Sequence, residues 1–311
     1  MENGYLGKKI IATRLSQLAQ CQTHLACQWL RKHSPSFEYE TLGFSTQGDR
    51  LIDIPLKDIG GKGAFVKELQ QALLERKADF AVHSMKDLPL TGVEGLSVSG
   101  FYAGENAPFD VLVSAYLHWE NLPSGSCIGT SSLRRAVQFL KLRPDCIVRP
   151  LRGNVLTRLE RLNKGDFNGL ILAEAGLNRL QLKQPYDVFE LHEMVPAFNQ
   201  GILGIECRDD DTVSSQLLGN ISDRSVALRT QWERTIAQIF DASCKSAIGV
   251  YAQVLSCEPL SVHLYIFACK NWDCMQSEDA IFSNLDLAKQ WTKEQFDCDH
   301  TSWAICQVTF T

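Results

Sequence analysis

The sequence predicts an α/β protein with two doubly wound lobes followed by a small C-terminal α+β domain. Short apolar runs alternate with segments whose apolar residues recur at helical spacing, a pattern typical of parallel sheets covered by helices. The chain has 311 residues, which is enough for two or three domains. After about residue 221 strands with period two replace the alternation. We therefore expect a domain boundary near that position.

The first lobe contains a glycine-rich turn at residues 60–63 that resembles a phosphate-binding loop. A P-loop needs Ser or Thr after its lysine to reach the metal ion, and Gly63 follows Lys62 here, so the sequence disfavours nucleotide binding. The elements expected in this lobe are a strand at residues 8–13, a helix to about residue 32, a strand at 37–44, a helix from about residue 65 and a strand from residue 80.

The stretch from Phe80 to Leu90 marks the expected centre of the first lobe. Three apolar residues open it, a polar group that includes Ser84, Lys86 and Asp87 follows, and Pro89 ends it. A buried parallel strand has this pattern, and open α/β sheets bind ligands outside the carboxyl ends of their strands. In extended geometry Lys86 and Asp87 would point to opposite sides. Asp87 is thus a candidate for chemistry, and a surface Lys–Asp pair before a turn is the alternative.

The second lobe repeats the alternation, and Ser131 and Ser132 are good caps for its first helix. The chain crosses back to the first lobe near Pro196 and adds one more strand there, at residues 203–207. The other expected elements are strands at 111–114, 126–130, 146–151, 169–173, 248–255 and 261–268, a helix that follows the two serines and ends at residue 140, and helices at 154–163, 223–240 and 285–296.

Positive charge gathers between Gly129 and Arg179, where basic residues outnumber acidic ones by ten to four although the chain has a net charge of −5. Most are arginines, whose planar guanidinium pairs two-pronged with carboxylate or phosphate. Arg134 and Arg135 fall in the first turns of a helix, where a cation opposes the helix dipole and an anion would compensate it. Arg152 ends a strand. A solvated basic face is the alternative, and it better fits Arg143, Arg161 and Lys164.

Composition excludes several classes of protein. The net charge of −5 gives no general indication of nucleic-acid binding. The eleven cysteines are scattered and lack zinc-knuckle spacing, so we expect reduced thiols in the cytoplasm and no metal. No stretch has the length of a membrane span, and the N-terminus has no signal-peptide core.

Two classes of function remain open at this point. One is an enzyme that acts on a small molecule with several carboxylates or phosphates. The other is a two-lobed binding module that closes on an anion. The missing signal peptide disfavours the binding module. Asp87 also favours the enzyme, because a purely anion-binding pocket gains nothing from a carboxylate.

Seven motifs along nearly the whole chain resemble those of the porphobilinogen deaminases (hydroxymethylbilane synthases). They are IATRLSQLA, GGKGAFVKEL, ADFAVHSMKDLP, GTSSLRR, LRGNVLTRL, AGLNRL and QGILGIECR, in the family's order. The resemblance implies a transferase of tetrapyrrole (haem) biosynthesis that joins four porphobilinogen units, releases ammonia at each and frees a linear tetrapyrrole. It also implies a dipyrromethane cofactor, which is held through a thioether and primes the chain.

The resemblance also implies a fold and the residues of the site. The two lobes would be similar to type II periplasmic binding domains, with lobe 1 at residues 1–103 and 199–220, lobe 2 at 104–198 and a cysteine-bearing domain at 221–311. The catalytic aspartate would be Asp87 and the cofactor cysteine Cys244. Further cofactor contacts fall on Asp87 itself, Ser84, Lys86, Thr130, Ser131, Ser132, Arg134, Arg135, Arg152 and Gly153. Substrate contacts fall on Arg14, Ser16, Gln22, Lys62, Arg152, Arg158, Arg179 and Gln200.

These residue types fit the implied chemistry. Each pyrrole unit brings an acetate and a propionate, whose charge arginines offset. Loss of ammonia leaves an azafulvenium cation, which a carboxylate stabilises while it shuttles a proton. The expected protein is a cytoplasmic monomer with porphobilinogen as its small-molecule partner, and without nucleic-acid or membrane partners.

The chain also departs from the family pattern near the implied site. The family usually has Arg where this chain has Gln47, and Gly where it has Asn199, Ala242 and Ser243. It usually has Val-Pro where this chain has Ser246 and Ala247, and a small or apolar residue where it has Glu174. The alternative function is therefore a slow or inactive paralogue that acts as a two-lobed binding protein for pyrrole carboxylates.

Overall fold

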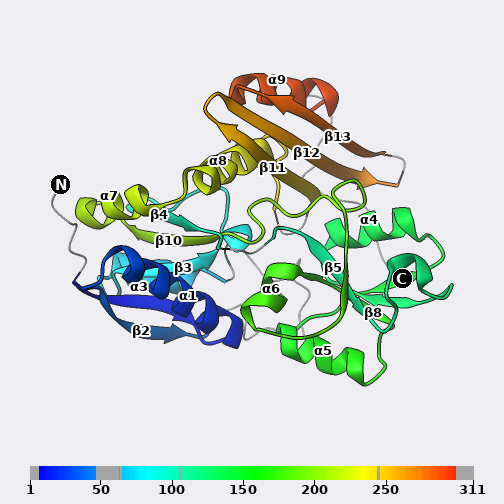
Figure 1. Cartoon of the computed structure of the whole chain (residues 1–311), viewed down its shortest axis with the longest axis horizontal. Helices are drawn as coiled ribbons and strands as arrows, with labels where there is room; N and C mark the ends of the chain where they lie inside the picture. The colour runs from blue at the N-terminus through cyan, green and yellow to red at the C-terminus, as the bar shows by residue number, and fades with distance from the viewer. Residues whose placement is uncertain are drawn as a thin grey trace. The chain divides into compact units, whose positions relative to one another are not determined.

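The computed structural model describes residues 7–46, 63, 65–104, 107–243, 246–272 and 274–298. The chain divides into two compact units (Figure 1). Unit 1 comprises Met1–Glu105 and Ile202–Ala227, and unit 2 comprises Asn106–Gly201 and Leu228–Thr311. Each unit has a five-stranded sheet, and unit 2 has a further three-stranded sheet. The predicted α/β class, with two lobes and a small C-terminal domain, is confirmed.

The sheet of unit 1 has the strand order β2-β1-β3-β10-β4. Helices α1 and α7 cover one face, where Leu30 and Leu218 pack against Phe80, and α3 covers the other face, where Leu73 packs near Ala81. The elements are β1 (Lys8–Arg14), α1 (Gln17–His33), β2 (Glu38–Phe44), α3 (Lys67–Leu74), β3 (Phe80–Ser84), η1 (Met85–Asp87), β4 (Leu96–Tyr102), β10 (Leu203–Arg208) and α7 (Thr212–Ile221).

The five-stranded sheet of unit 2 has the order β7-β6-β8-β5-β9. Helix α4 covers one face, where Phe139 packs against Ile128, and α5 and α6 cover the other, where Leu159 and Leu177 pack against Leu170. The elements are β5 (Asp110–Ser114), η2 (Trp119–Asn121), β6 (Cys127–Gly129), α4 (Leu133–Leu142), β7 (Ile147–Arg149), α5 (Val155–Asn163), β8 (Gly169–Ala173), α6 (Glu174–Arg179) and β9 (Tyr186–Val188).

Both five-stranded sheets are mixed, so the prediction of parallel sheets is wrong for part of each. β10 runs antiparallel to β3 and β4, and β5 runs antiparallel to β8 and β9. β10 and β5 follow the points at which the chain passes from one unit to the other. A strand that enters in this way does not follow a crossover helix of its own lobe, so the βαβ rule does not set its direction.

The C-terminal part of unit 2 is an antiparallel sheet with the order β11-β12-β13. Helix α9 packs on it (Figure 1). The Phe282 and Trp291 rings are 5.3 Å apart. Val137 of α4 packs against Ala247 and Phe267 of this sheet. The elements are α8 (Arg224–Ile239), which begins in unit 1 and continues into unit 2 from Leu228, β11 (Ala247–Cys257), β12 (Leu260–Asn271), β13 (Cys274–Phe282) and α9 (Leu285–Gln295).

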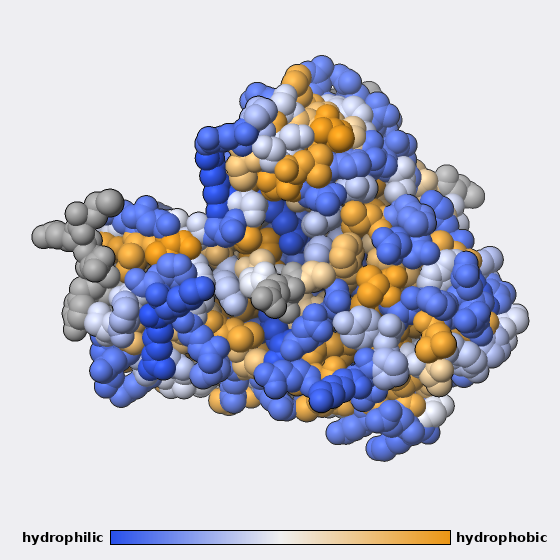
Figure 2. Space-filling model, viewed as in Figure 1, coloured by the Kyte–Doolittle hydropathy of each residue, from blue (hydrophilic) through white to orange (hydrophobic). Residues whose placement is uncertain are grey.

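Hydrophilic residues cover most of the face that Figure 2 shows, and apolar residues form smaller groups among them. Within the described ranges, the structure contains no helix with the length and apolar character that a membrane crossing requires. The same ranges contain no cluster of three or more His, Cys, Asp or Glu side chains suited to a metal ion.

Candidate functional site

The carboxyl end of β3 carries Ser84, Lys86 and Asp87 on unit 1. The strand is buried through His83, and the chain then enters the 3₁₀ turn η1 at Met85. The expectation that Lys86 and Asp87 continue in extended geometry is therefore wrong, because both lie inside this turn. All three of the predicted site residues in this stretch are half-buried at the edge where β3 ends.

The Asp87 carboxylate makes no hydrogen bond or ion pair with any residue that the structure describes. Its neighbour Ser84 accepts a hydrogen bond at Oγ from Nε2 of Gln22, 3.0 Å away, and Gln22 is buried on α1. The serine is thus oriented by the protein, whereas the aspartate keeps its acceptor capacity for a ligand. A half-buried carboxylate of this kind favours a cationic group beside it.

Arg14 lies at the same edge, because β1 is the parallel neighbour of β3. Its guanidinium carbon is 4.5 Å from the centre of the Phe65 ring, a cation–π contact that supports the side chain. The Ser16 hydroxyl caps α1 and accepts a hydrogen bond from the Ala19 amide, 3.4 Å away. Lys62 and Gln47, also named from the sequence, lie outside the described residues.

In unit 2, Arg134 and Arg135 both point at Asp110, a residue that sequence reasoning did not single out. Arg134 Nη1 is 2.6 Å from Asp110 Oδ2, and Arg135 Nε is 2.8 Å from Oδ1. Asp110 is fully buried, and the two arginines are 4% and 7% exposed. The anion that compensates these cations is therefore part of the protein.

The ionisation of Asp110 depends on its hydrogen-bond partners. Burial alone would raise the pKa of this carboxyl, but the guanidiniums of Arg134 and Arg135 and the bond from the Gln200 amide lower the pKa well below its usual range. Gln200 Nε2 donates to Asp110 Oδ1 at 3.0 Å and to the Pro108 carbonyl at 2.6 Å. Gln200, expected to contact substrate, is thus buried in this network.

The predicted hydroxyl donors before α4 shape their own loop. Ser132 caps α4 and accepts from the Arg135 amide at 3.4 Å, and Thr130 Oγ1 accepts from the Ser132 amide at 3.2 Å. Ser131 Oγ donates to the Leu151 carbonyl at 2.8 Å. Thr130 is buried, and both serines are half-buried. These contacts fix the backbone from which Arg134 and Arg135 project.

Arg152, in the loop between β7 and α5, and Arg158, on α5, are half-buried. Gly153 between them has φ of 107°, a conformation open to glycine, and Arg158 Nε donates to its carbonyl at 2.9 Å. Arg179 is buried on α6 and donates to the Gly201 carbonyl. The predicted arginines of unit 2 thus differ in exposure, and Arg152 and Arg158 are the more accessible.

Arg143 does not belong to a solvated basic face, so that alternative is wrong at this position. Its side chain is 12% exposed and donates to the carbonyls of Trp119 and Leu122, each at 2.7 Å, as well as to Asp145. The guanidinium thus joins the carbonyls at the turn η2 to the acid that follows α4. Arg161 is exposed and pairs with Asp166, as a surface residue would.

The expected cofactor residue, Cys244, lies outside the described residues. On either side of it, Ser246 Oγ accepts from the Ser243 amide at 2.7 Å and donates to the Ser243 carbonyl at 2.8 Å. Neither Ala242 nor Ser243 is among the residues with positive φ. Replacing the family's glycines here therefore brings no left-handed strain.

Asn199, another departure from glycine, does have a left-handed backbone, with φ of 56°. Its main-chain amide and its Nδ2, at 3.1 Å, both donate to Oε2 of Glu233 on α8. Glu233 is fully buried, and its Oε1 accepts from Arg229 Nε at 2.7 Å. The segment at residues 199–201 is thus held by α8 within unit 2.

Glu174, at the first turn of α6, accepts a hydrogen bond from the Tyr186 hydroxyl at 3.1 Å. Burial raises the pKa of Tyr186, and the nearby Glu174 carboxylate raises it further. The acid is therefore directed at β9 rather than at the arginines of α4, whose anionic partner is Asp110.

Sequence reasoning missed Asp110 and Glu233, which are both fully buried acids. A usable signal existed for Asp110, because a single acid directly precedes the apolar run of β5. An acid at the start of a buried strand needs a buried cation, and the adjacent arginines of α4 were available for that role. Glu233 lies inside an amphipathic helix and gives no such local signal.

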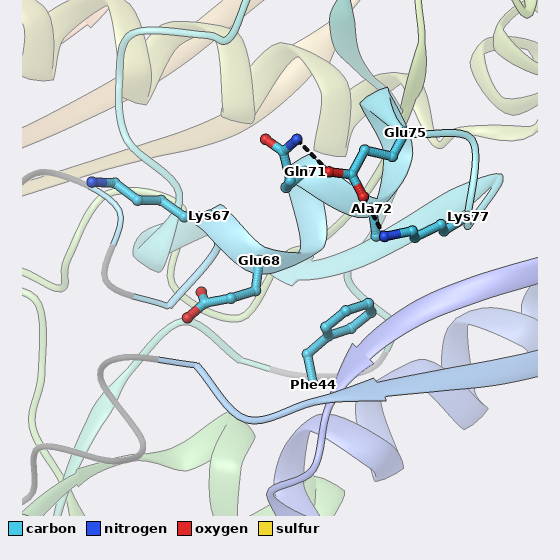
Figure 3. Close-up of a pocket in the computed structure, with 7 residues that line it drawn as sticks. All are labelled: Phe44, Lys67, Glu68, Gln71, Ala72, Glu75 and Lys77. Carbon is cyan, nitrogen blue, oxygen red and sulfur yellow. Dashed lines mark hydrogen bonds and ion pairs between the residues drawn. The ribbon is translucent and has the colours of Figure 1, made fainter.

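A pocket on unit 1 lies along α3 (Figure 3), and one of its lining residues, Phe44 of β2, is the register partner of Arg14 on β1. Glu75 there accepts a hydrogen bond from Gln71 Nε2 at 2.8 Å and forms an ion pair with Lys77 at 2.5 Å. The charges of Glu75 and Lys77 therefore largely compensate one another. None of the predicted site residues within the described ranges is among those that line it, which are Phe44, Lys67, Glu68, Gln71, Ala72, Glu75 and Lys77.

Residues 10–216 match the family model described as "Porphobilinogen deaminase, dipyromethane cofactor binding domain". Among solved structures, a putative methionine-binding lipoprotein from Bacillus subtilis is similar, with 12% identity, a TM-score of 0.42 and coverage of 73% of this chain and 94% of that chain. The periplasmic aliphatic sulphonate binding protein SsuA from Escherichia coli has 12% identity, a TM-score of 0.39 and coverage of 74% and 69%. The periplasmic VFT2 domain of Bordetella pertussis BvgS has 12% identity, a TM-score of 0.39 and coverage of 68% and 86%. Structural similarity at this level does not identify a ligand.

Proposed function

Because the chain belongs to the porphobilinogen deaminase family, we propose that it is a transferase that condenses four porphobilinogen units into the linear tetrapyrrole hydroxymethylbilane. Each addition releases ammonia, and a dipyrromethane on Cys244 primes the series. The observation that carries the proposal is Asp87, a half-buried carboxylate without a protein partner in the described residues, at the carboxyl end of a central strand.

Asp87 suits each stage of one addition. Its carboxylate pairs with the ammonium of the incoming unit; the C–N bond then breaks, its electron pair leaves with ammonia and the positive charge passes to the pyrrole ring. The same carboxylate stabilises this azafulvenium cation. When the new C–C bond forms at the methylene carbon, Asp87 accepts the proton that the attacking pyrrole carbon loses and passes it to ammonia.

The residues at the matched positions fit a dipyrromethane. Bound there, this group would supply the pyrrole carbon to which the first unit is joined. Arg14 and Lys86 in unit 1 and Arg152 and Arg158 in unit 2 are half-buried cations, which suit acetate and propionate carboxylates. Arg134 and Arg135, held on Asp110, add to the positive potential of unit 2.

The first test is the mass of the purified protein. We expect the intact protein to be heavier than the bare polypeptide, with peptide mapping that places the addition on Cys244. Cys244→Ser should have the bare mass and no turnover, whereas Cys274→Ser, a matched change in β13, should load normally. An active protein of unmodified mass would contradict the proposal.

A second candidate function is a two-lobed binding protein for pyrrole carboxylates. Asp110 favours it, because this residue occupies the two arginines that the family motif directs at the cofactor. Ammonia release during incubation with porphobilinogen separates the two candidates. Binding by calorimetry without ammonia release would support the binding protein and exclude the transferase.

Two further expectations belong to this proposal, a cytoplasmic location and a monomeric state. No cysteine in the described ranges forms a disulfide, which agrees with a reducing compartment. Sedimentation of the loaded protein at several concentrations would test the monomer, and a concentration-dependent mass would contradict it.

A further inference from the structure

Strand β10 carries a motif, LGIE, to which the proposed chemistry gives no role. It pairs antiparallel with β3, so that Gly204 lies opposite His83 and Leu203 opposite Ser84. β10 therefore runs alongside the strand end that carries Asp87, and its residues are candidates for holding that end in place.

The side chain of Met85 lies directly over Gly204. A Cβ atom on Gly204 would be 2.2 Å from Met85 Sδ and 3.1 Å from Met85 Cγ, far inside van der Waals contact, and 3.0 Å from Val98 Cγ1. Met85 is 1% exposed, so the packed interior leaves its side chain little room to move. The absence of a side chain at Gly204 thus leaves the space on the sheet that Met85 fills.

Met85 is also the first residue of η1, the turn that contains Asp87. Its amide donates to the Ile202 carbonyl at 3.0 Å, and its carbonyl accepts from the Leu88 amide at 3.3 Å. The turn is thus attached to the start of β10 by its backbone and to Gly204 by its first side chain. A displacement of Met85 would move Asp87, which lies two residues further along the same turn.

A buried polar group fastens the same two strands nearby. His83 Nε2 is 2.9 Å from Glu206 Oε2, and Glu206 Oε1 accepts from Gln70 Nε2 of α3 at 3.0 Å. All three side chains are buried. Breaking such a pair is costly, so β3 and β10 resist sliding at the position where η1 begins.

We propose that Gly204 is a positioning residue for Asp87: by leaving room for Met85, it sets the orientation of η1 and of the carboxylate that the turn carries. The catalytic meaning of that orientation rests on the proposed function, whereas the packing of Met85 on Gly204 does not. An alanine at position 204 should displace Met85 and turn η1. A reacting group misplaced by about 1 Å typically costs about 10²-fold in rate.

The test uses the full chain labelled with ¹³C at the aspartate carboxyl carbons, with the Asp87 signal identified by its loss in Asp87→Asn. Gly204→Ala should shift this signal and lower kcat by about 10²-fold, with a smaller change in KM. In the background of Met85→Ala, which removes the Met85 Sδ and Cγ contacts and leaves that of Val98 Cγ1 at 3.0 Å, adding Gly204→Ala should change neither the signal nor kcat further. Gly100→Ala is the matched control, since the atoms nearest to its Cβ belong to Leu218 and Ile205.

Each outcome decides the proposal. It is wrong if Gly204→Ala leaves the Asp87 signal in place, if Gly100→Ala shifts it equally, or if the change persists in the Met85→Ala background. Should Gly204→Ala fail to fold, the doubly substituted protein must fold and match Met85→Ala; if it does not, Gly204 is needed for another reason and the proposal is wrong. If the signal responds as expected but the wild type does not consume porphobilinogen, the positioning is upheld and the proposed function fails.

Discussion

Asp87 of unit 1 and Asp110 of unit 2 are both aspartates at strand ends of five-stranded sheets, and their surroundings are opposite. Asp110 is fully buried and accepts hydrogen bonds from two guanidiniums and an amide. Asp87 is half-buried and has no partner among the described residues. A carboxylate already saturated by protein donors maintains the fold, whereas one without donors is available to a ligand. The contrast lies in the partners, which residue type alone does not reveal.

The largest effect is expected at Asp87. Asp87→Asn should lower the rate of ammonia release by about 10²–10⁴-fold, because the amide keeps the shape but can neither carry the charge nor exchange the proton. The free energy of unfolding should stay nearly unchanged, since Asp87 has no partner among the residues that the structure describes. Asp209→Asn, an exposed change in the same unit, is the control. Near-normal turnover in Asp87→Asn would remove it from catalysis.

At Asp110 the main effect of substitution should be a loss of stability. Asp110→Asn leaves two buried arginines without their counter-charge, and breaking a buried pair in this way typically costs about 3–5 kcal/mol. Urea unfolding of the purified variant would measure the loss, with Asp145→Asn, an exposed partner of Arg143, as the comparison. Unchanged stability in Asp110→Asn would mean that the arginines find another anion.

The same carboxylate predicts a pH dependence of stability. The pKa of Asp110 in the folded protein lies below its unfolded value of about 3.9, so its contribution is fully present above that value. As the pH falls through about 4 and below, the unfolded chain takes up the proton first and the contribution is lost. Between about pH 6 and pH 3, the free energy of unfolding measured in urea should fall less in Asp110→Asn than in the wild type. An equal dependence of the free energy of unfolding on pH in the two proteins would contradict the lowered pKa.

Much of the fold was predictable because core strands and helices carry strong periodicity. The apolar run of β3 and the polar residues after it placed Asp87 at a strand end, where the structure has it. Three strands were missed, β4, β9 and β13, and each is at the edge of its sheet. An edge strand buries less of its surface, so its sequence is less apolar and its pattern weaker.

The site was less predictable than the fold because its partners are distant in sequence. Arg134 and Asp110 are 24 positions apart, and nothing local to either residue names the other. The excess of arginine correctly indicated that an anion was needed, but the sequence could not tell whether protein or ligand supplies it. The packing of Met85 on Gly204 was equally hard to predict, because these residues are distant in sequence and meet through the pairing of β3 with β10.

A moderate effect is expected at Arg143, which sequence analysis placed on the solvated face. Arg143→Ala removes hydrogen bonds to the Trp119 and Leu122 carbonyls, so stability should fall by about 1–3 kcal/mol. Cofactor loading should be unaffected, whereas substitution of Arg134, Arg135 or Arg152 should impair it. Arg161→Ala, which breaks an exposed pair, should cost less than about 1 kcal/mol. Equal loading defects at all these positions would mean a general electrostatic field without individual carboxylate sites.

The smallest effects are expected where the chain departs from glycine. Asn199→Gly keeps the main-chain bond to Glu233 and removes the side-chain bonds to Glu233 and Thr230, so the segment joining the units should loosen. Glycine also adopts the observed φ of 56° without strain. Asn199→Ala is the control, since alanine loses the same side-chain bonds but is strained at this φ.

This loosening should act late in the reaction. We expect the wild type to load its cofactor and to be slowest in the later additions or in product release, because those steps must accommodate the longest chain. Asn199→Gly should speed them by a few-fold and leave the first addition unchanged, while glycine at Ala242 or Ser243 should do less, since neither residue has a left-handed backbone. Mass spectrometry of enzyme-bound intermediates after limited porphobilinogen would follow each addition. If the wild type passes through all four additions evenly and Asn199→Gly changes none of them, the side chain of Asn199 does not limit turnover, and its bonds to Glu233 serve stability alone.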